Sequence, residues 1–575
     1  MFQTEIIEQD VVIIGAGGAG LRAALELADA KYNIAIISKV PVLKSHTIAA
    51  QGGINAPLGN YGADQADWFI YDTVKASDYL ADQDAVEILC NEAEQVINDL
   101  AALAVPFTKD EQGQIYQRKY GGQTVNFGAA LARRACGVGD QTGAEIMLKL
   151  HQAVLAKQNI KIYAEHFAIE LLTDAQQISG VLIWDFASGK IKIFKTKYII
   201  IASGGFAGLY KTNTAAQICT GDGLSLALRS GAMLKDMEFV QFHPTALSSN
   251  GVLISEAARG EGAYLTNNLG EKFMEQYAPK YRDLASRDVI ARAIFNELKE
   301  GRGCGEAADH VHLNIAHLGK EIIDKYLSNL VSNSKLFAKI DPYQEPIPVR
   351  PAAHYTMGGI ATDKNSRVIG LSGLYAIGEA ACTSVHGANR LGCNSLLELM
   401  VFGKQAALAI KEDFKANDLV VQHEVSLKKF HDNFREIKSL ADIAELKSAL
   451  GKILEDYVGV VRDEASLQQA LVEYNKLSAE IEQLTISDTN LKHNNELLAL
   501  LELKNLNQLA RIVIESALAR QESRGAHYRS DHPQRDDQKF MQHSIYSDAV
   551  GLDFAEVRKI TGRLAAKLKP EARKY

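Results

Sequence analysis

A run of glycines directly after an apolar, β-branched segment constrains the fold of this chain more than any other feature. Val11–Ile14 reads as a short buried strand, and Gly15-Ala16-Gly17-Gly18-Ala19-Gly20 follows it at once. The next ten residues have helical character, and a second apolar strand is expected at residues 34–37. A strand, a tight turn, a helix and a parallel strand form the opening unit of a doubly wound α/β domain.

Gly15, Gly17 and Gly20 match the spacing G-x-G-x-x-G. In such a turn the first glycine permits the tight bend, the second lets backbone approach a pyrophosphate, and the third lets helix and strand pack closely. The helix N-terminus then offers free N–H groups to the phosphates. The carboxylate expected on the second strand for NAD is replaced by Ser38-Lys39, which counts against free NAD without proving FAD.

The domain organisation follows from where further strands occur. Residues 197–203 and 374–377 also read as buried strands, and if both join the first sheet the nucleotide domain is discontinuous. Beyond about residue 421 glycine and proline become scarce, and Leu497, Leu500 and Leu501 recur at helical spacing. We therefore expect an α/β fold: a discontinuous Rossmann-like domain at 1–235 plus 351–420, an inserted α+β capping domain at 236–350, a helical domain at 421–530 and a C-terminal domain at 531–575.

Charge and cysteine content exclude several classes of function. The chain has 62 basic and 70 acidic residues, a formal net charge of −8, so nothing favours nucleic acid as a partner. The six cysteines show no C-x-x-C pair, so we expect reduced, mostly buried thiols and no metal or iron–sulfur cluster. We see neither a signal peptide nor an apolar run of about 20 residues, so any membrane association is expected to depend on other proteins.

The segment Lys44 to Gly53 carries a more specific signal. Ser45-His46-Thr47 and Gln51-Gly52-Gly53 resemble the succinate dehydrogenase and fumarate reductase flavoprotein family, and the resemblance covers nearly the whole chain. It resumes at Thr220-Gly221-Asp222-Gly223, at residues 378–380, at residues 387–396 and in the tail at 524–537. It implies FAD, bonded covalently to His46 through the flavin 8α-methyl group. Glu379 would contact the ribose, and Ser395 and Leu396 would line the isoalloxazine ring.

The motif and the resemblance together predict an extended set of cofactor contacts. These are Gly15, Ala16, Gly17, Gly18, Ala19, Gly20, Ser38, Lys39, Ser45, His46, Thr47, Gln51, Gly52, Gly53, Asp222, Glu379, Arg390, Ser395 and Leu396.

Cationic and hydrogen-bonding residues gather in and just after the expected cap, around residues 243, 255–262, 286–288 and 350–355. Together they suit a small dianion, because planar arginines bind carboxylates with two hydrogen bonds. The resemblance implies succinate or fumarate, with His354 and Arg390 on one carboxylate and His243 and Ser255 on the other. The family usually has Thr where Ser255 stands, and the hydroxyl is kept.

The resemblance also implies the proton-transfer groups. Arg287 would donate or accept the proton, and Glu256 and Arg259 would relay it to solvent. An arginine pKa above about 12 makes Arg287 an easier proton donor than base, so a neighbouring carboxylate such as Glu256 would have to take the proton during oxidation. Ala144 stands where relatives commonly have a histidine near the FAD, which leaves local flavin contacts open.

Three other readings are weighed against a succinate dehydrogenase. L-Aspartate oxidase is similar but lacks the histidine that matches His46. A non-enzymatic flavin-binding subunit would be free to lose the substrate residues, which are all present here. A soluble one-chain fumarate reductase would need its own second redox centre, and no such motif occurs.

Electrons must therefore leave the chain. The expected electron acceptor is an iron–sulfur subunit. The family resemblance also implies membrane anchor subunits and a quinone, with the complex on the cytoplasmic face of a bacterial inner membrane. Whether succinate oxidation or fumarate reduction is preferred is open, because both directions use the same residues.

Overall fold

The centre of the molecule is a parallel five-stranded sheet. The computed structural model describes residues 4–415, 424–433, 442–486 and 488–572. The strand order of the central sheet is β18-β11-β2-β3-β7. Its strands are β2 (Val11–Ile14), β3 (Ile34–Ser38), β7 (Ile160–Ala164), β11 (Tyr198–Ile201) and β18 (Leu374–Ala376). β18 pairs with β11 in parallel although they are far apart in sequence, which confirms that distant segments build one sheet.

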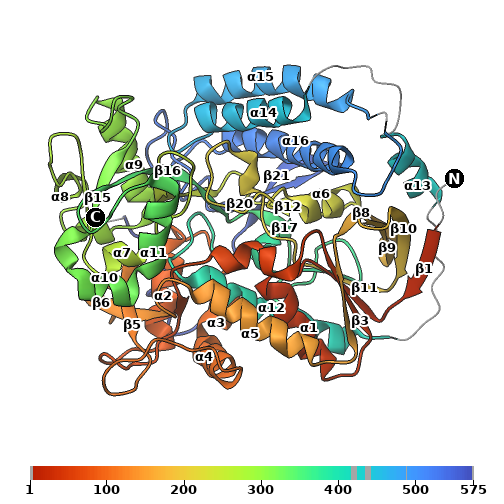
Figure 1. The fold of residues 1–575 in the computed structure, drawn as a ribbon, viewed down its shortest axis with the longest axis horizontal. Coiled ribbons are helices and arrows are strands. Elements are labelled where there is room, and N and C mark those ends of the chain that lie inside the picture. Colours follow the sequence, from red (N-terminus) through yellow and green to blue (C-terminus); the bar gives the residue numbers. More distant parts are fainter. Residues whose placement is uncertain (1–3, 416–423, 434–441, 487, 573–575) are drawn as a thin grey trace.

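Alternate side chains of β2 enter two different cores, as the two-residue period of a strand requires. Val11 and Ile13 pack with the helices drawn below the sheet in Figure 1. Val12 and Ile14 enter the core of the opposite face, which a second sheet and the C-terminal helices share. The first group of helices is α1 (Gly18–Ala28), α2 (Ala66–Ala76), α3 (Gln83–Asn91), α4 (Ala93–Ala102), α5 (Thr142–Leu155) and α12 (Asn394–Asp413).

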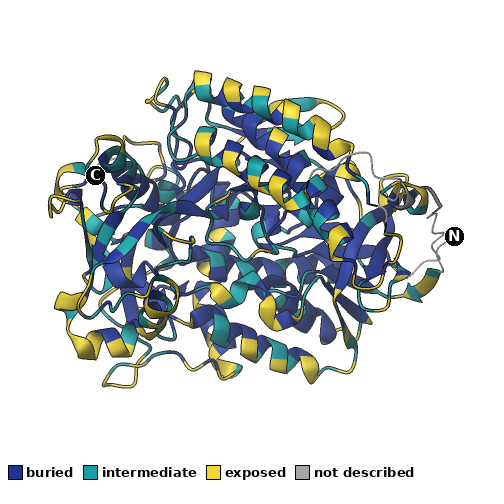
Figure 2. Ribbon diagram, turned by 45° about the horizontal axis from the view of Figure 1, so that its top comes forward, coloured by how far each residue is buried: buried dark blue, intermediate teal, exposed yellow. Residues whose placement is uncertain are grey.

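Two further sheets flank the parallel one. One has the order β1-β10-β9-β8, with β1 (Thr4–Glu8), β8 (His166–Asp174), β9 (Gln177–Asp185) and β10 (Lys190–Lys195). The other has the order β4-β6-β5, with β4 (Ile54–Asn55), β5 (Gln117–Val125) and β6 (Ala130–Cys136). Helix α6 (Asp222–Arg229) packs against α16 (Asn495–Ala519). Figure 2 shows that the strands at the centre of the molecule, such as β2, β3 and β11, are buried.

The segment between β12 (Leu234–Lys235) and β17 (Gly359–Ala361) forms a layer of its own, green in Figure 1. An antiparallel sheet of order β13-β16-β15-β14 packs with short helices over a separate apolar core. Its elements are β13 (Val240–Leu247), α7 (Ala257–Gly260), β14 (Tyr264–Thr266), α8 (Met274–Tyr277), η4 (Arg282–Leu284), α9 (Arg287–Lys299), β15 (Val311–Asn314), α10 (Lys320–Tyr326), α11 (Ser328–Asn333) and β16 (Ile347–Thr356). This agrees with an α+β insertion, and the limits 236 and 350 stay a prediction.

The C-terminal part begins with helices and ends with a hairpin. The helices are α13 (Glu424–His431), α14 (Ile443–Tyr457), α15 (Glu464–Glu482) and α16 (Asn495–Ala519). The hairpin of β20 (Gln542–Ser547) and β21 (Gly551–Glu556) joins a sheet with β12 (Leu234–Lys235), β17 (Gly359–Ala361) and β19 (Ala381–Cys382). The expected boundary at 420/421 lies outside the described residues, and the boundary at 530/531 stays a prediction.

Two sequence features can be placed on this fold. All six cysteines lie among the described residues, where each is buried and unbridged. Within the described ranges, no helix combines the length and the apolar character needed to cross a bilayer.

Candidate active site

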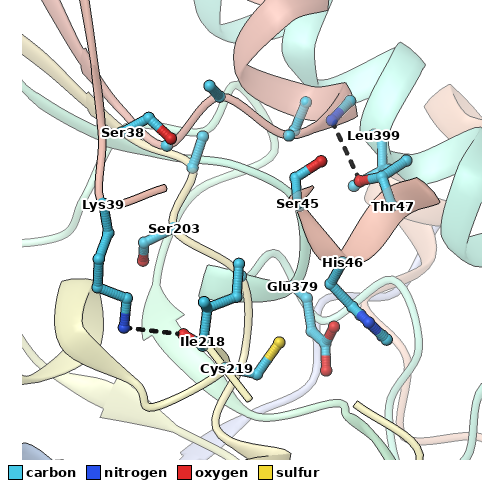
Figure 3. Close-up of a pocket in the computed structure, with 18 of the residues that line it drawn as sticks. Ser38, Lys39, Ser45, His46, Thr47, Ser203, Ile218, Cys219, Glu379 and Leu399 are labelled. Carbon is cyan, nitrogen blue, oxygen red and sulfur yellow. Dashed lines mark hydrogen bonds between the residues drawn. The ribbon is translucent and has the colours of Figure 1, made fainter. Parts of the chain in front are cut away.

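A large cavity opens where the parallel strands end. It encloses about 1310 Å³ of empty space, open mouth included, and residues that follow β2, β3, β11 and β18 line it. Ligands of open α/β sheets bind at this carboxyl edge. Figure 3 shows labelled side chains from the first βα unit, from the segment after β11 and from the segment after β18 around this one space.

The glycine turn forms one end of the cavity. Gly15 has φ of 118°, and a Cβ there would lie 2.1 Å from the Ala202 carbonyl oxygen, so only glycine fits. The Gly18 N–H at the start of α1 donates to Thr47 Oγ1 at 3.1 Å. Five of the six predicted residues of the turn line the cavity. The exception, Gly20, faces the Gly15 carbonyl, which is the packing role predicted for the third glycine.

Ser38 and Lys39 line the cavity, yet both already have partners inside the protein. The Ser38 hydroxyl donates to the Val40 carbonyl at 2.6 Å. Lys39 Nζ forms ion pairs of 2.7 Å with Asp222 and 2.6 Å with Glu502. Burial alone would lower the pKa of Lys39, but the two carboxylates outweigh it and raise the pKa. Lys39 therefore ties the wall of the cavity to α16 rather than offering a free charge.

His46 lines the cavity as the first residue of the 3₁₀ helix η2 (His46–Ala49). Its Nδ1 accepts a hydrogen bond from the Ala216 N–H at 3.1 Å. Burial, together with Arg390, lowers the pKa of His46 to about 4. The imidazole is therefore neutral near pH 7, and Nε2 is the nitrogen that this hydrogen bond leaves for other chemistry.

The remaining predicted cofactor contacts divide into two groups. Glu379, Ser395 and Leu396 line the cavity, as do Ser45, Thr47 and Asp222. Glu379 accepts from the Thr356 N–H at 3.0 Å and from its hydroxyl at 3.1 Å, and burial raises the pKa of Glu379 to about 7. Gln51, Gly52 and Gly53 lie beside the lining instead. The Gln51 amide donates to the Leu253 carbonyl at 3.2 Å, and its oxygen has no partner in the described part of the chain.

Two arginines meet through one glutamine at the edge of the cavity. Arg287 Nε donates to Glu256 at 2.8 Å, and Arg287 Nη1 donates to Gln241 Oε1 at 2.9 Å. Arg390 Nη2 donates to the same oxygen at 3.1 Å, and the guanidinium lies 4.3 Å from the Tyr355 ring. Burial and Arg287 together lower the pKa of Arg390 to about 10, although Tyr355 and Glu379 oppose them.

Gln241 is a site residue that the sequence reasoning missed. It stands two positions before His243 on β13, so the two-residue period of a strand places both on one face. This alternation along the strand could have identified Gln241 from the sequence. Thr214 was also missed, since nothing in the sequence links it to His354, which it contacts at 2.7 Å.

The two predicted substrate histidines lie together. The rings of His243 and His354 are 4.9 Å apart, centroid to centroid. Burial and Arg287 hold the pKa of both well below the usual histidine value, so both rings are neutral. His354 lines the cavity, whereas His243 and Ser255 are buried behind the lining. The Ser255 oxygen accepts from the Ala257 N–H at 3.1 Å, which leaves its own O–H able to donate.

The predicted proton-transfer residues form one buried chain. Glu256 lies between Arg287 and Arg259, and the latter is 3.7 Å away. Burial alone would raise the pKa of Glu256, but the two arginines outweigh it and lower the pKa. Arg259 Nη1 donates to the Asp283 carbonyl at 2.8 Å, and its Nε and Nη2 have no hydrogen-bond partner among the described residues.

The cavity fits a dinucleotide beside an anion. The glycine turn and the N-terminus of α1 at its end suit a pyrophosphate. Gly204 belongs to the wall, and a Cβ there would meet nothing within 4 Å, so the backbone is open to a ligand. A family sequence model described as FAD binding domain matches residues 10–396. The fold and the site therefore define a flavoprotein, an FAD-dependent oxidoreductase.

Comparisons with known proteins narrow this class. A second family model, described as fumarate reductase flavoprotein C-term, matches residues 447–575. The chain is 44% identical to the succinate dehydrogenase flavoprotein subunit of Rickettsia bellii, over 96% of this chain and 95% of the relative. It is 37% identical to the fumarate reductase flavoprotein subunit of Mycobacterium tuberculosis, over 94% of each. A chain of Escherichia coli quinol fumarate reductase superposes with a TM-score of 0.92 and 32% identity, covering 99% of this chain and 100% of that one. The chain belongs to the succinate dehydrogenase and fumarate reductase flavoprotein family.

Proposed function

We propose that the chain is the catalytic flavoprotein subunit of a succinate dehydrogenase and oxidises succinate to fumarate. The observation that carries this proposal is the buried cluster beside the FAD cavity. Arg259, Arg287 and Arg390 have one carboxylate, Glu256, within ion-pair distance in the described structure. Buried charges are normally compensated, and a bound dicarboxylate supplies the missing negative charge.

Two donor groups at fixed separation would hold the two carboxylates. His354 and Arg390 would bind one, and His243 and the Ser255 hydroxyl would bind the other. Both histidines are neutral, so each offers a single N–H as donor. A ligand with only one carboxylate would leave buried donors unpaired, which is the basis of selectivity for dicarboxylates.

The chemistry that bound FAD supplies is reversible acceptance of a hydride. The chain itself must move the proton from the neighbouring carbon. Arg287 holds its guanidinium in place through Glu256 and Gln241, and we propose that it donates or accepts this proton. Glu256 then exchanges it with Arg259, whose contact with the Asp283 carbonyl leads toward the surface of the cap.

We also propose that His46 carries the FAD covalently. The low pKa of His46 keeps the imidazole neutral, and the Ala216 N–H on Nδ1 places the ring proton on Nε2, so Nε2 would give up that proton as the flavin is attached. An imidazole alkylated at Nε2 keeps its lone pair on Nδ1, and the Ala216 N–H already occupies that lone pair. The hydrogen bond thus matches the product of flavin attachment.

For the other components we propose an iron–sulfur subunit as electron acceptor, membrane anchor subunits, and a quinone beyond them. Relatives include chains of quinol fumarate reductase, which is consistent with assembly into such a complex. The proposed place is the cytoplasmic face of a bacterial inner membrane, with this chain held peripherally. Fumarate reductase is the alternative direction, and L-aspartate oxidase is the alternative enzyme.

The test starts from the assembled protein, denatured in acid and analysed for flavin that stays on the peptide. We expect FAD on the peptide that contains His46 and none in His46→Ala, together with succinate oxidation by the wild type. Retained flavin with no turnover of succinate or fumarate would refute the enzymatic proposal. Loss of all flavin, with turnover of L-aspartate, would favour the oxidase.

A further inference from the structure

A second cavity lies on the far side of the arginine pair from the FAD cavity. It encloses about 810 Å³ of empty space, open mouth included. Its walls come from the end of α2, from the middle of β5, and from the turn that joins η4 to α9. These elements belong to the FAD-binding part and to the cap, so this cavity lies in the seam between them (Figure 1).

The inner end of this cavity reaches the catalytic groups. Glu256 and Arg287 line it, and so does Arg390. Arg390 also lines the FAD cavity, so its side chain is the wall that the two cavities share. The Nε of Arg390 has no hydrogen-bond partner in the described part of the protein. A small molecule in the second cavity would therefore contact Arg390, the proposed substrate-binding arginine, on the side that faces away from the FAD cavity.

The charges along the walls favour an anion. Asp72 is an acidic lining residue, but it forms an ion pair with Arg134 and accepts from Thr124. Glu256 is the other lining acid, and Arg287 compensates it. The charge of Lys75, in contrast, is not compensated in the described structure. Its ammonium donates to the Tyr71 hydroxyl at 3.3 Å and has no carboxylate within ion-pair distance among the described residues. Lys75 and Arg390 thus leave uncompensated positive charge at two places in one cavity.

We propose that this second cavity is the access vestibule of the active site, through which a small dicarboxylate passes between solvent and Arg390, with Lys75 as its first cationic contact. The proposal rests on the proposed function, since the anion is the substrate or product itself. A cationic, low-dielectric cleft concentrates anions and raises their association rate, and salt screens the effect. The charge of Lys75 therefore acts mainly on the rate of binding.

The first test uses the assembled complex and malonate, an unreactive dicarboxylate, in stopped-flow binding experiments. We expect Lys75→Gln to lower the association rate constant about threefold to fivefold at low ionic strength. The difference should vanish near 1 M salt, where the Debye length is about 3 Å. Lys476→Gln removes the same charge from an exposed position on α15 and should leave the rate unchanged. A purely structural role for Lys75 would not give a salt-dependent effect.

The second test narrows the cavity without changing charge. Ala76 lines the vestibule at the end of α2, and Ala76→Leu adds three carbon atoms to it. A narrower route should slow malonate association and dissociation together, at least threefold each, and leave Kd within twofold of the wild type. A changed Kd with normal association would place the residue at the binding site instead and would contradict the proposal.

Different results would refute the vestibule and the proposed enzymatic function. If the wild-type complex oxidises succinate and binds malonate, but both variants bind malonate at the wild-type rate in low salt, the vestibule is refuted and the enzyme is not. If the wild-type complex neither binds malonate nor oxidises succinate, the proposed function fails, and the vestibule fails with it.

Discussion

Two groups of buried arginines in this molecule differ in how their charge is balanced. In the tail cluster, Arg520, Arg524 and Arg529 each pair with two carboxylates within 3.1 Å. In the active-site cluster, Arg259, Arg287 and Arg390 have only Glu256 within ion-pair distance in the described structure. Both groups are almost fully buried. In these two groups, full compensation goes with arginines that join parts of the fold, and incomplete compensation goes with arginines beside the proposed anion site.

The sharpest way to test this difference is to alter Arg287 while keeping its charge. Lysine cannot reproduce the planar fork that contacts both Glu256 and Gln241. We expect Arg287→Lys to lower the rates of succinate oxidation and fumarate reduction by about 10²–10⁴-fold, the usual contribution of a positioned proton-transfer group. Thermal stability and flavin content should stay near the wild type. Turnover within tenfold of the wild type would contradict the role of Arg287.

The matching change in the tail cluster is Arg520→Met. It leaves Glu238 and Glu522 buried without their shared partner. Breaking a buried pair on one side typically costs about 3–5 kcal/mol, so the apparent free energy of unfolding should fall by that amount. Thermal denaturation of the purified protein measures it. If Arg520→Met keeps wild-type stability but loses activity, the proposed structural role of the tail cluster is wrong.

A smaller effect is expected from a third compensated group, around His543 on β20. Burial alone would lower the pKa of His543, but Asp236 and Asp82 outweigh it and raise the pKa above the usual histidine value of about 6.5, with Lys235 opposing them. A raised folded pKa adds stability that is complete below pH 6.5 and is lost as pH rises through the folded pKa. The wild type should therefore lose stability over that interval, and His543→Gln should lose less. If the unfolding free energies of the wild type and of His543→Gln change in parallel with pH, His543 does not contribute this pH-dependent stability.

The sequence allowed the local parts of the site to be predicted but not their long-range partners. The glycine turn was predictable because its three roles follow from one short strand-to-helix unit. The contacts of Lys39 were not, because Asp222 and Glu502 reach it from distant segments. The Ala216 N–H that meets His46 is likewise a backbone group with no sequence signature. The covalent bond to His46 and the individual site roles stay predictions.

The pairing of Lys39 with Glu502 on α16 also has a consequence for how the protein is made. Lys39 in the wall of the FAD cavity gains its partner Glu502 only when α16 has been synthesised, and the central sheet is complete only when β18 has emerged. At about 5–20 residues per second, the ribosome needs about 25 to 100 s to reach that helix. Through most of this interval, until β18 and the lining residues after it have emerged, the nascent chain carries a glycine turn that cannot yet enclose its cofactor. Cofactor loading is therefore expected late in synthesis or after it.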